Sequence, residues 1–287
     1  MNPPVAPSAA PAMLDRALPD LDAWAAWFRR AEIPVLADTA DALEAMRANE
    51  DDVDANLIGE MVAHDPLMTV KILAHTATHR PARRVTDVET VTAAIVMMGI
   101  SPFFGTFGPQ PVIEARLAPI DGALDGLQQV LRRAHRASRF AFAFAVHRMD
   151  LDAAVIHEAA LLHDFAELLL WSHAPALALE IRRRQQADPT LRSATVQREV
   201  LNTTLSELQQ ALMKAWLLPE LLIRISDEKQ ADSHPSVRSV LLAIRIARHS
   251  ADGWDNAALP DDLAELSRLL NLSADATNEL LQKVDNF

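Results

Sequence analysis

An adjacent histidine and aspartate, His163 and Asp164, are the residues of this sequence most suited to chemistry. They interrupt the run AALLHDFAELLLW, in which nearly every other residue is apolar. An ionised carboxylate buried among apolar side chains is costly unless it is paired or bound to a metal. Imidazole nitrogen and carboxylate oxygen suit divalent ions such as zinc, iron and manganese. The two residues therefore form either part of a metal site or a hydrogen-bonded cross-link between helices, and their spacing alone favours the cross-link.

A third candidate, His135, lies 28 residues before His163 in the basic stretch RRAHR. If its helix packs antiparallel to the one that carries His163, the imidazole can face His163 and Asp164; otherwise it belongs to a solvated basic patch. Arg132 and Arg136 are four residues apart, which places them on one face of a helix. They are suited to contact an anionic ligand or an acidic partner, although such a row more often makes salt bridges on a solvated face.

The composition excludes several classes of site. The 287 residues include no Cys and only 7 Gly, so thiolate metal sites, disulfides and a Cys nucleophile are excluded and a glycine-rich phosphate loop is disfavoured. The formal net charge of −12 repels phosphate backbones, which argues against nucleic-acid binding. No targeting segment or membrane span is expected, because prolines interrupt both long uncharged stretches. These features predict a cytoplasmic protein.

The elements that must position these residues are predicted to be helices. Apolar residues recur at helical spacing nearly everywhere and no strand alternation is found, so the fold class is all-α. We interpret residues 1–20 as a disordered Pro/Ala-rich tail, 79–86 as a basic loop and 101–120 as irregular. The predicted helices cover about 21–28, 39–48, 54–63, 66–78, 88–98, 124–147, 152–171, 175–186, 194–215, 219–226, 236–250, 260–270 and 274–285.

Five segments resemble, in order, the motifs of one helical family. They are IPVL at 33–36, the stretch 58–73 with its Asp-Pro, the stretch 85–100 ending in Gly-Ile, His135 with LLHDFAELLL at 161–170, and AWLLPE at 215–220. Together they resemble the HDOD domain, an output-domain relative of the HD metal-dependent phosphohydrolases. The resemblance implies a multi-helix HD-like bundle with an N-terminal helical lobe, and it implies a role in bacterial signalling.

The sequence departs from the ligand pattern that the resemblance implies. A further His is expected before the WLLP element, where this chain reads TTLSEL, and a His pair is expected after it, where the chain reads SDEKQ. A late Asp is expected near 247–248, where the chain has Ala-Arg. His135, His163 and Asp164 would then remain as a vestigial metal site. Two-metal phosphodiester hydrolysis needs more ligands than three, so we expect no catalytic residues and no cofactor.

The predicted organisation is a tail, an HDOD domain and a C-terminal extension. The HDOD domain covers 21–226, with an N-terminal lobe at about 21–118 and the HD-like lobe from about 121. The helices of 227–287 are expected to pack on the HD-like lobe. The predicted function is a non-catalytic signal-transduction module that contacts another signalling or regulatory protein, without nucleic acid or membrane.

Two alternatives stay open. In one, His135, His163 and Asp164 hold a single divalent metal ion with an activated water, and Arg132 or Arg136 binds the phosphate of a substrate. The chain would then be a divergent phosphohydrolase with an incomplete HD site. In the other, the old active-site cavity binds a nucleotide or another anion without turnover, and the chain is a sensor.

Overall fold

A computed structural model describes residues 13–79, 88–188, 190–227, 229 and 234–286 of the chain. The described residues fold into helices joined by short turns, which confirms the predicted all-α class. They contain no β-sheet, and the single β-bridge joins Val35 to Val112. None of the described helices has the length and apolar character needed to cross a membrane.

The helices follow one another closely along the chain. Their bounds are α1 Leu21–Phe28, α2 Ala37–Ala48, the 3-10 helix η1 Glu50–Asp52, α3 Ala55–Val62, α4 Pro66–Thr78, α5 Val91–Met98, α6 Ile100–Thr106, α7 Ile113–Leu117, α8 Ala123–His147, α9 Ala153–Leu161, α10 Phe165–His173, α11 Pro175–Ala187, α12 Ser193–Leu201, α13 Leu205–Ala215, α14 Glu220–Ile225, α15 Pro235–His249, α16 Leu259–Leu270 and α17 Ala274–Asp285.

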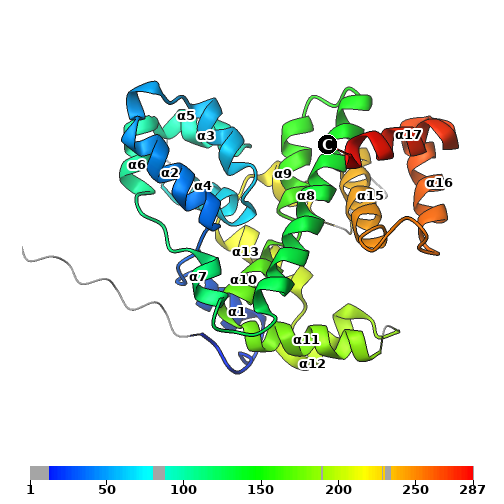
Figure 1. Cartoon of the computed structure of the whole chain (residues 1–287), viewed down its shortest axis with the longest axis horizontal. Helices are drawn as coiled ribbons and strands as arrows, with labels where there is room; N and C mark the ends of the chain where they lie inside the picture. The colour runs from blue at the N-terminus through cyan, green and yellow to red at the C-terminus, as the bar shows by residue number, and fades with distance from the viewer. Residues whose placement is uncertain (1–12, 80–87, 189, 228, 230–233, 287) are drawn as a thin grey trace, which may run out of the picture.

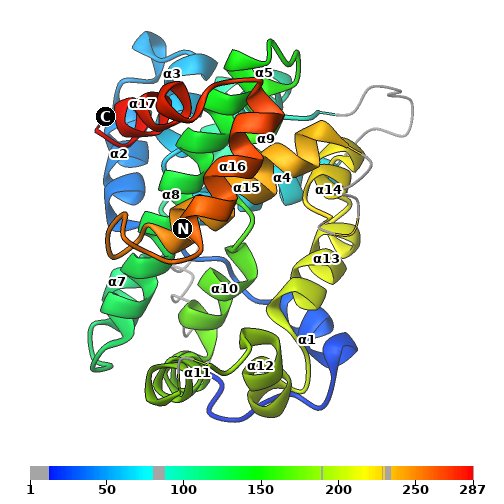
Figure 2. The same ribbon diagram turned by 90° about the vertical axis from the view of Figure 1, so that its right-hand side faces the viewer.

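The long helix α8 stands between two groups of helices (Figure 1). Helices α2–α6, which we call the N-terminal lobe, lie on one side of α8 and α9, and α15–α17 lie on the other. Helices α10–α13 lie at the N-terminal end of α8, where α11 and α12 pack side by side (Figure 2). One connected cluster of buried apolar side chains runs through all of these parts.

The N-terminal lobe is organised around the buried carboxylate of Asp65, which is fully shielded from solvent. This carboxylate accepts hydrogen bonds from the backbone amides of Leu67 and Met68, at 2.9 and 3.0 Å, and so caps the start of α4. It also accepts a bond of 2.8 Å from the amide of Leu36, just before α2. Burial raises the pKa of Asp65, and these three amides partly offset that rise. One side chain therefore fixes two helix starts.

The first helix does not belong to the N-terminal lobe. Helix α1 packs against α13, and the indole nitrogen of Trp24 donates a hydrogen bond of 2.8 Å to the carbonyl of Leu201. Residues 21–28 therefore lie on the HD-like side of the molecule, although the sequence placed them with the N-terminal lobe. The predicted tail also ends earlier than residue 20, because apolar residues from Met13 to Leu18 pack against the core and Leu14 donates to the carbonyl of His173 at 2.7 Å. Residues 1–12 lie outside the described part.

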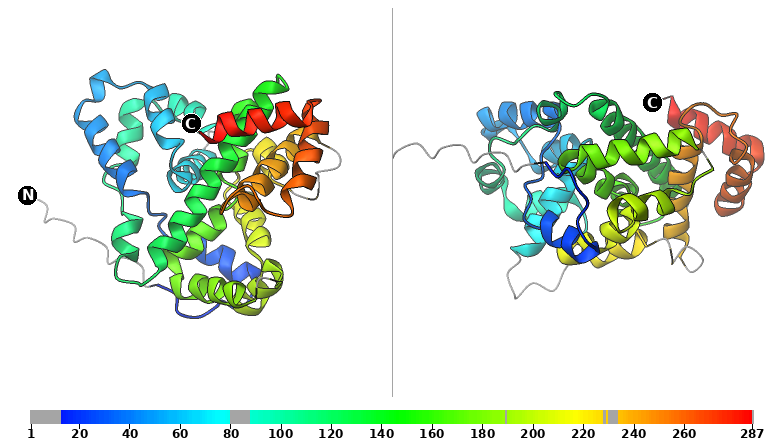
Figure 3. Two further views of the ribbon diagram at one scale, coloured as in Figure 1. Left: turned by 45° about the vertical axis from the view of Figure 1, so that its right-hand side comes forward. Right: turned by 90° about the horizontal axis from the view of Figure 1, so that it is seen from below.

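The C-terminal helices pack on α8. Helix α15 runs along α8, and α17 crosses it (Figure 3). The Arg136 guanidinium of α8 donates to both carboxylate oxygens of Asp285 at 2.8 Å and to the hydroxyl of Ser250 at 2.9 Å. A side chain of the central helix thus holds the last helix in place.

Four predicted segments differ in detail from the structure. The helix expected over 152–171 is broken at 162–164, between α9 and α10, and the helix expected over 194–215 is broken at Asn202, whose φ is 63°. Thr204 and Glu207 then form a capping box that starts α13. The segment 101–120 is helical in part, since it contains most of α6 and all of α7. Helix α5 starts after Thr90, which caps it, while most of the predicted basic loop lies outside the described residues.

A buried acid joins the two lobes. The carboxylate oxygen Oε1 of Glu158, on α9, accepts a hydrogen bond of 2.8 Å from the amide of Val91 at the start of α5. Glu158 is 5% exposed, and burial raises its pKa to about 8, against the smaller opposing effect of the Val91 hydrogen bond. The folded protein therefore keeps a proton on Glu158 at a pH where the unfolded chain has lost it.

The titration of Glu158 predicts how stability depends on pH. Between about pH 4.5 and 8 the folded state binds more protons than the unfolded state, so the free energy of unfolding should fall as pH rises, by about 3–5 kcal/mol in total. Glu158→Gln removes this titration while keeping the shape of the side chain. Urea denaturation should find the variant more stable than wild type at pH 8 and closer to it at pH 5. An equal difference at both pH values would contradict the assignment.

Candidate functional site

The break between α9 and α10 presents the predicted His163 and Asp164 at the surface of a cavity. Leu162, with φ near −87°, ends α9, and Asp164 precedes the first residue of α10. Because both residues lie in the turn, the Asp164 side chain can reach α8 instead of following one face of a long helix. The imidazole Nδ1 of His163 lies 3.1 Å from the Asp164 oxygen Oδ1, so these two side chains form a hydrogen-bonded pair.

An arginine of α8 completes this cluster. The Nε of Arg133 donates to Oδ2 of Asp164, and its Nη2 donates to Oε2 of Glu167, both at 2.7 Å. Glu167 lies in the first turn of α10, three residues after Asp164, so one guanidinium spans two neighbouring carboxylates of the same element. We call Arg133, His163, Asp164 and Glu167 the Arg133 cluster.

The charges of the cluster stabilise one another. Burial raises the pKa of Asp164, but the Arg133 guanidinium, the His163 hydrogen bond and the charge of Arg248 outweigh burial and hold this pKa well below its usual range. Burial lowers the pKa of Arg133, and Asp164 and Glu167 outweigh burial to raise it. The ion pair therefore favours the carboxylate form of Asp164 and the cationic form of Arg133.

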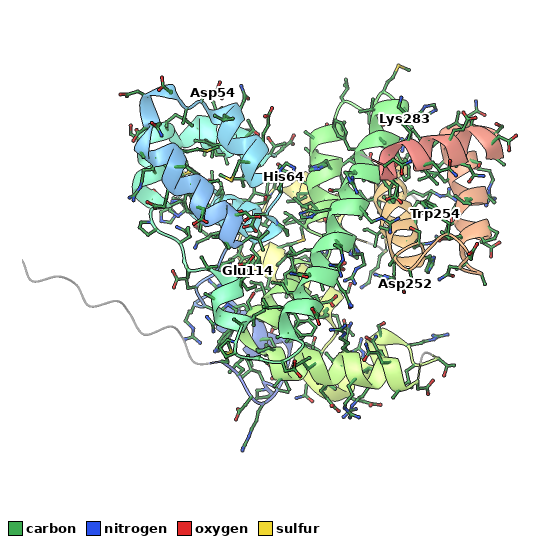
Figure 4. All side chains as sticks on the ribbon, viewed as in Figure 1. Asp54, His64, Glu114, Asp252, Trp254 and Lys283 are labelled. Atoms are coloured by element: carbon green, nitrogen blue, oxygen red, sulfur yellow. The ribbon has the colours of Figure 1, made fainter. Side chains whose placement is uncertain are left out.

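His135 does not join the other two predicted ligands. Its Nε2 lies 2.8 Å from the backbone carbonyl oxygen of His64, in the turn after α3 (Figure 4). Successive residues of a helix turn by about 100°, so His135 faces about 200° away from Arg133 on α8. Since Arg133 faces Asp164, His135 must face the N-terminal lobe. Burial lowers the pKa of His135, which keeps the imidazole neutral at this contact.

The two arginines predicted to contact an anion lie apart from the cluster. Arg136 is committed to Asp285 and Ser250 on the C-terminal side, and its guanidinium carbon lies 5.7 Å from the centre of the Phe140 ring. Arg132 is exposed on α8. The arginine that contacts the acidic pair is Arg133, between them. Sequence reasoning missed it, although two carboxylates three residues apart, Asp164 and Glu167, were a signal that one guanidinium could bridge them.

The donor set does not fit a metal ion. Both oxygens of Asp164 are engaged, one by Arg133 and one by His163, and Arg248 adds a second positive charge beside them. A cation at this carboxylate would displace or oppose both guanidinium groups. In the described ranges, no group of three or more His, Asp or Glu side chains is placed to hold a metal.

The Arg133 cluster forms one wall of a cavity of about 490 Å³ between α8, α10, α11, α12 and α13. Arg182, of α11, and Arg248, near the end of α15, also line it. On α8 the cavity face carries Gly126, seven residues before Arg133 and therefore on the same side of the helix. A Cβ atom at Gly126 would lie 2.2 Å from the Trp171 ring, so the indole packs directly on the backbone of α8.

Arg133 should be essential for stability. Arg133→Gln leaves two partly buried carboxylates without their counter-charge, which we expect to cost about 3 kcal/mol of unfolding free energy. Adding Asp164→Asn should restore part of the loss, because only Glu167 then remains unpaired. Arg132→Gln, one residue away on the exposed side, is the matched control and should change stability by less than about 0.5 kcal/mol. Chemical denaturation of the four proteins measures these differences, and equal effects of Arg132→Gln and Arg133→Gln would refute the assignment.

Comparison with known proteins identifies the family. The HDOD domain model matches residues 33–231. No curated protein matches the chain. Among solved structures, the MmoQ response regulator from Methylococcus capsulatus strain Bath superposes with a TM-score of 0.66 and 21% identity, over 87% of this chain and 98% of that one. A virulence factor, cj0248, from Campylobacter jejuni superposes with a TM-score of 0.63 and 16% identity, over 92% of this chain and 98% of that one. These likenesses show a shared fold, and the family match, which spans most of the sequence, shows that the chain belongs to the HDOD domain family.

Proposed function

We propose that this chain is a non-catalytic signalling module that acts through contact with another regulatory protein. The observation that carries the proposal is the ion pair between Arg133 and Asp164, because it places a guanidinium where a metal-dependent hydrolase needs a divalent ion. The fold shared with the MmoQ response regulator supports a place in signal transduction. Of the alternatives from the sequence, hydrolysis by a single metal ion loses one ligand when His135 bonds to the N-terminal lobe.

The way in which the lobes meet supports a mechanism of signalling. The polar contacts described between the N-terminal lobe and α8–α9 are few, and include the bond of His135 to the carbonyl of His64 and that of Glu158 to the amide of Val91. Both involve a side chain on one lobe and the backbone of the other. We infer that a signal changes the packing between the lobes at these contacts, and that the change alters the surface offered to the partner.

A row of exposed apolar side chains supports protein contact. Phe142 and Val146 lie about one turn apart near the end of α8, and Met149 and Leu151 lie in the segment just beyond that end. Their exposed fractions are 46%, 54%, 86% and 101%. Contiguous exposed apolar surface is typical of interaction sites. The partner proposed here is a protein that covers this row with an apolar surface of its own.

The absence of hydrolysis is tested with the full chain purified without chelators. Neither wild type nor Asp164→Asn should hydrolyse bis(4-nitrophenyl) phosphate, cyclic dinucleotides or cyclic mononucleotides in the presence of manganese, magnesium, iron, nickel or zinc. Bound transition metal should stay below about a tenth of an equivalent. Metal-dependent turnover by wild type that Asp164→Asn abolishes would overturn the proposal.

The contact is tested in the source cell with a photo-crosslinking amino acid. Placed at Met149, it should join the chain to one defined protein, since this side chain lies in the middle of the exposed row. Leu191, which is 40% exposed and lies between α11 and α12, is the matched control position and should give no such product. The Met149 product should disappear when Phe142 is replaced by Glu. Equal crosslinking from Met149 and Leu191, or products that Phe142→Glu leaves unchanged, would contradict a specific contact at the end of α8.

A further inference from the structure

Among the described residues that line it, the cavity beside the Arg133 cluster has more positive than negative side chains. Three arginines line it, and two carboxylates, Asp164 and Glu167, face them. Both carboxylates are bound to Arg133. In the described part of the chain, no carboxylate lies within ion-pair distance of Arg182 or Arg248, and the hydrogen bond of Arg182 is a long one, 3.4 Å, to the carbonyl of Gly122. Two guanidinium groups are thus left for another anion.

This local charge runs against the charge of the molecule. The chain as a whole carries −12, so most of its surface repels anions. Three arginines, from α8, α11 and α15, lie around this one cavity. Their positive charges repel one another unless negative charge nearby offsets the repulsion. The two acids among the described lining residues supply less negative charge than the three arginines require. A bound anion would supply the remainder.

The uncharged part of the cavity wall is suited to a polar ligand body. Five glutamines line it, and their amides can both donate and accept hydrogen bonds: Gln129, Gln185, Gln197, Gln209 and Gln210. Two further lining residues each carry a buried polar group, the indole nitrogen of Trp171 and the hydroxyl of Ser226, that has no hydrogen-bond partner among the described residues. Trp171 is 3% exposed and Ser226 is 5% exposed. Buried polar groups without partners are unfavourable, and a polar ligand would satisfy them if these two side chains turned toward the cavity.

We propose that this cavity binds a small organic anion, with a phosphate or carboxylate group held by Arg182 and Arg248 and a polar body held by the glutamines. A volume of about 490 Å³ falls within the range of small-molecule sites. The inference rests on the proposed function, because it supplies the input signal of a module that does not turn its ligand over. The ligand bridges α11 to α15 across the Arg133 cluster, and so couples two parts of the molecule that pack on α8.

Two neighbouring arginines of α11 give a matched pair for the test. Arg182 lines the cavity, whereas Arg183 is 69% exposed and is paired with Glu180 on the outer side. Isothermal titration of the full chain at constant ionic strength uses glucose 6-phosphate and inorganic phosphate as phosphate probes, citrate as a carboxylate probe and glucose as a neutral control. Wild type should bind at least one anionic probe saturably and should not bind glucose alone. Arg182→Gln and Arg248→Gln should each weaken binding about tenfold or more, since each removes a charge-assisted hydrogen bond, while Arg183→Gln stays within about twofold.

Each result decides for or against the site. Tighter binding of the phosphate probes than of citrate assigns a phosphate ester, and the reverse order assigns a carboxylate. A change in tryptophan fluorescence on binding that Trp171→Phe removes would place the probe in this cavity. No saturable binding of any anionic probe up to about 10 mM, or equal losses in Arg182→Gln and Arg183→Gln, would overturn the inference. Metal-dependent turnover of a bound probe would overturn the proposed function and leave the binding site standing.

Discussion

The geometry of one helix constrains the whole molecule. Helix α8 contacts the turn before α10, the N-terminal lobe and the C-terminal helices, and it does so with Arg133, His135 and Arg136 within four consecutive positions. A helix turns by about 100° per residue, so these side chains leave it in different directions, about 200° apart for the first two and about 60° apart for the first and the last. Each polar contact therefore fixes the rotation of α8 for the other two. A substitution that breaks one of these contacts therefore affects how α8 packs against the partners of the other two.

The ion pair within the cluster fixes geometry more than it adds stability. A buried pair of opposite charges recovers little net free energy, because removing both ions from water offsets their attraction, but loss of one partner is severe. Arg133 therefore ties α8 to α10 in one arrangement. The same guanidinium occupies one carboxylate oxygen of Asp164. The positive charge of Arg133 thus holds the site in one arrangement, and it also supports the proposed lack of turnover.

Much of the fold followed from the sequence, and the site followed only in part. Apolar spacing predicted nearly every helix, and the adjacent His163 and Asp164 marked the wall of the cavity. The run from 159 to 171 showed no local sign of a break, because its apolar residues suit a continuous helix. The break accompanies tertiary contacts, namely the hydrogen bond between His163 and Asp164 and the ion pair of Asp164 with Arg133 of α8. The choice between Arg132, Arg133 and Arg136 depended on the rotation of α8, which tertiary packing sets.

The sequence did not point to the glutamines of the cavity, because the packing of separate helices, and not a regular spacing in the sequence, brings them together. They come from α8, α11, α12 and α13, and become neighbours only when α11 and α12 fold back beside α10 (Figure 2). The same holds for Arg182 and Arg248, which lie 66 positions apart in the sequence. Residues that meet across such separations carry no local pattern that distinguishes them from ordinary surface residues.

The contact of Trp171 with Gly126 links the position of the indole, which lines the cavity, to the size of residue 126. Alanine is a better helix former than glycine by about 1 kcal/mol, so a methyl group at position 126 would be gained readily if nothing opposed it. That methyl group would meet the indole at 2.2 Å and push it toward the space it now borders. Replacing Gly126 by alanine would thus favour the helical backbone of α8 but reduce the space for a ligand in the cavity.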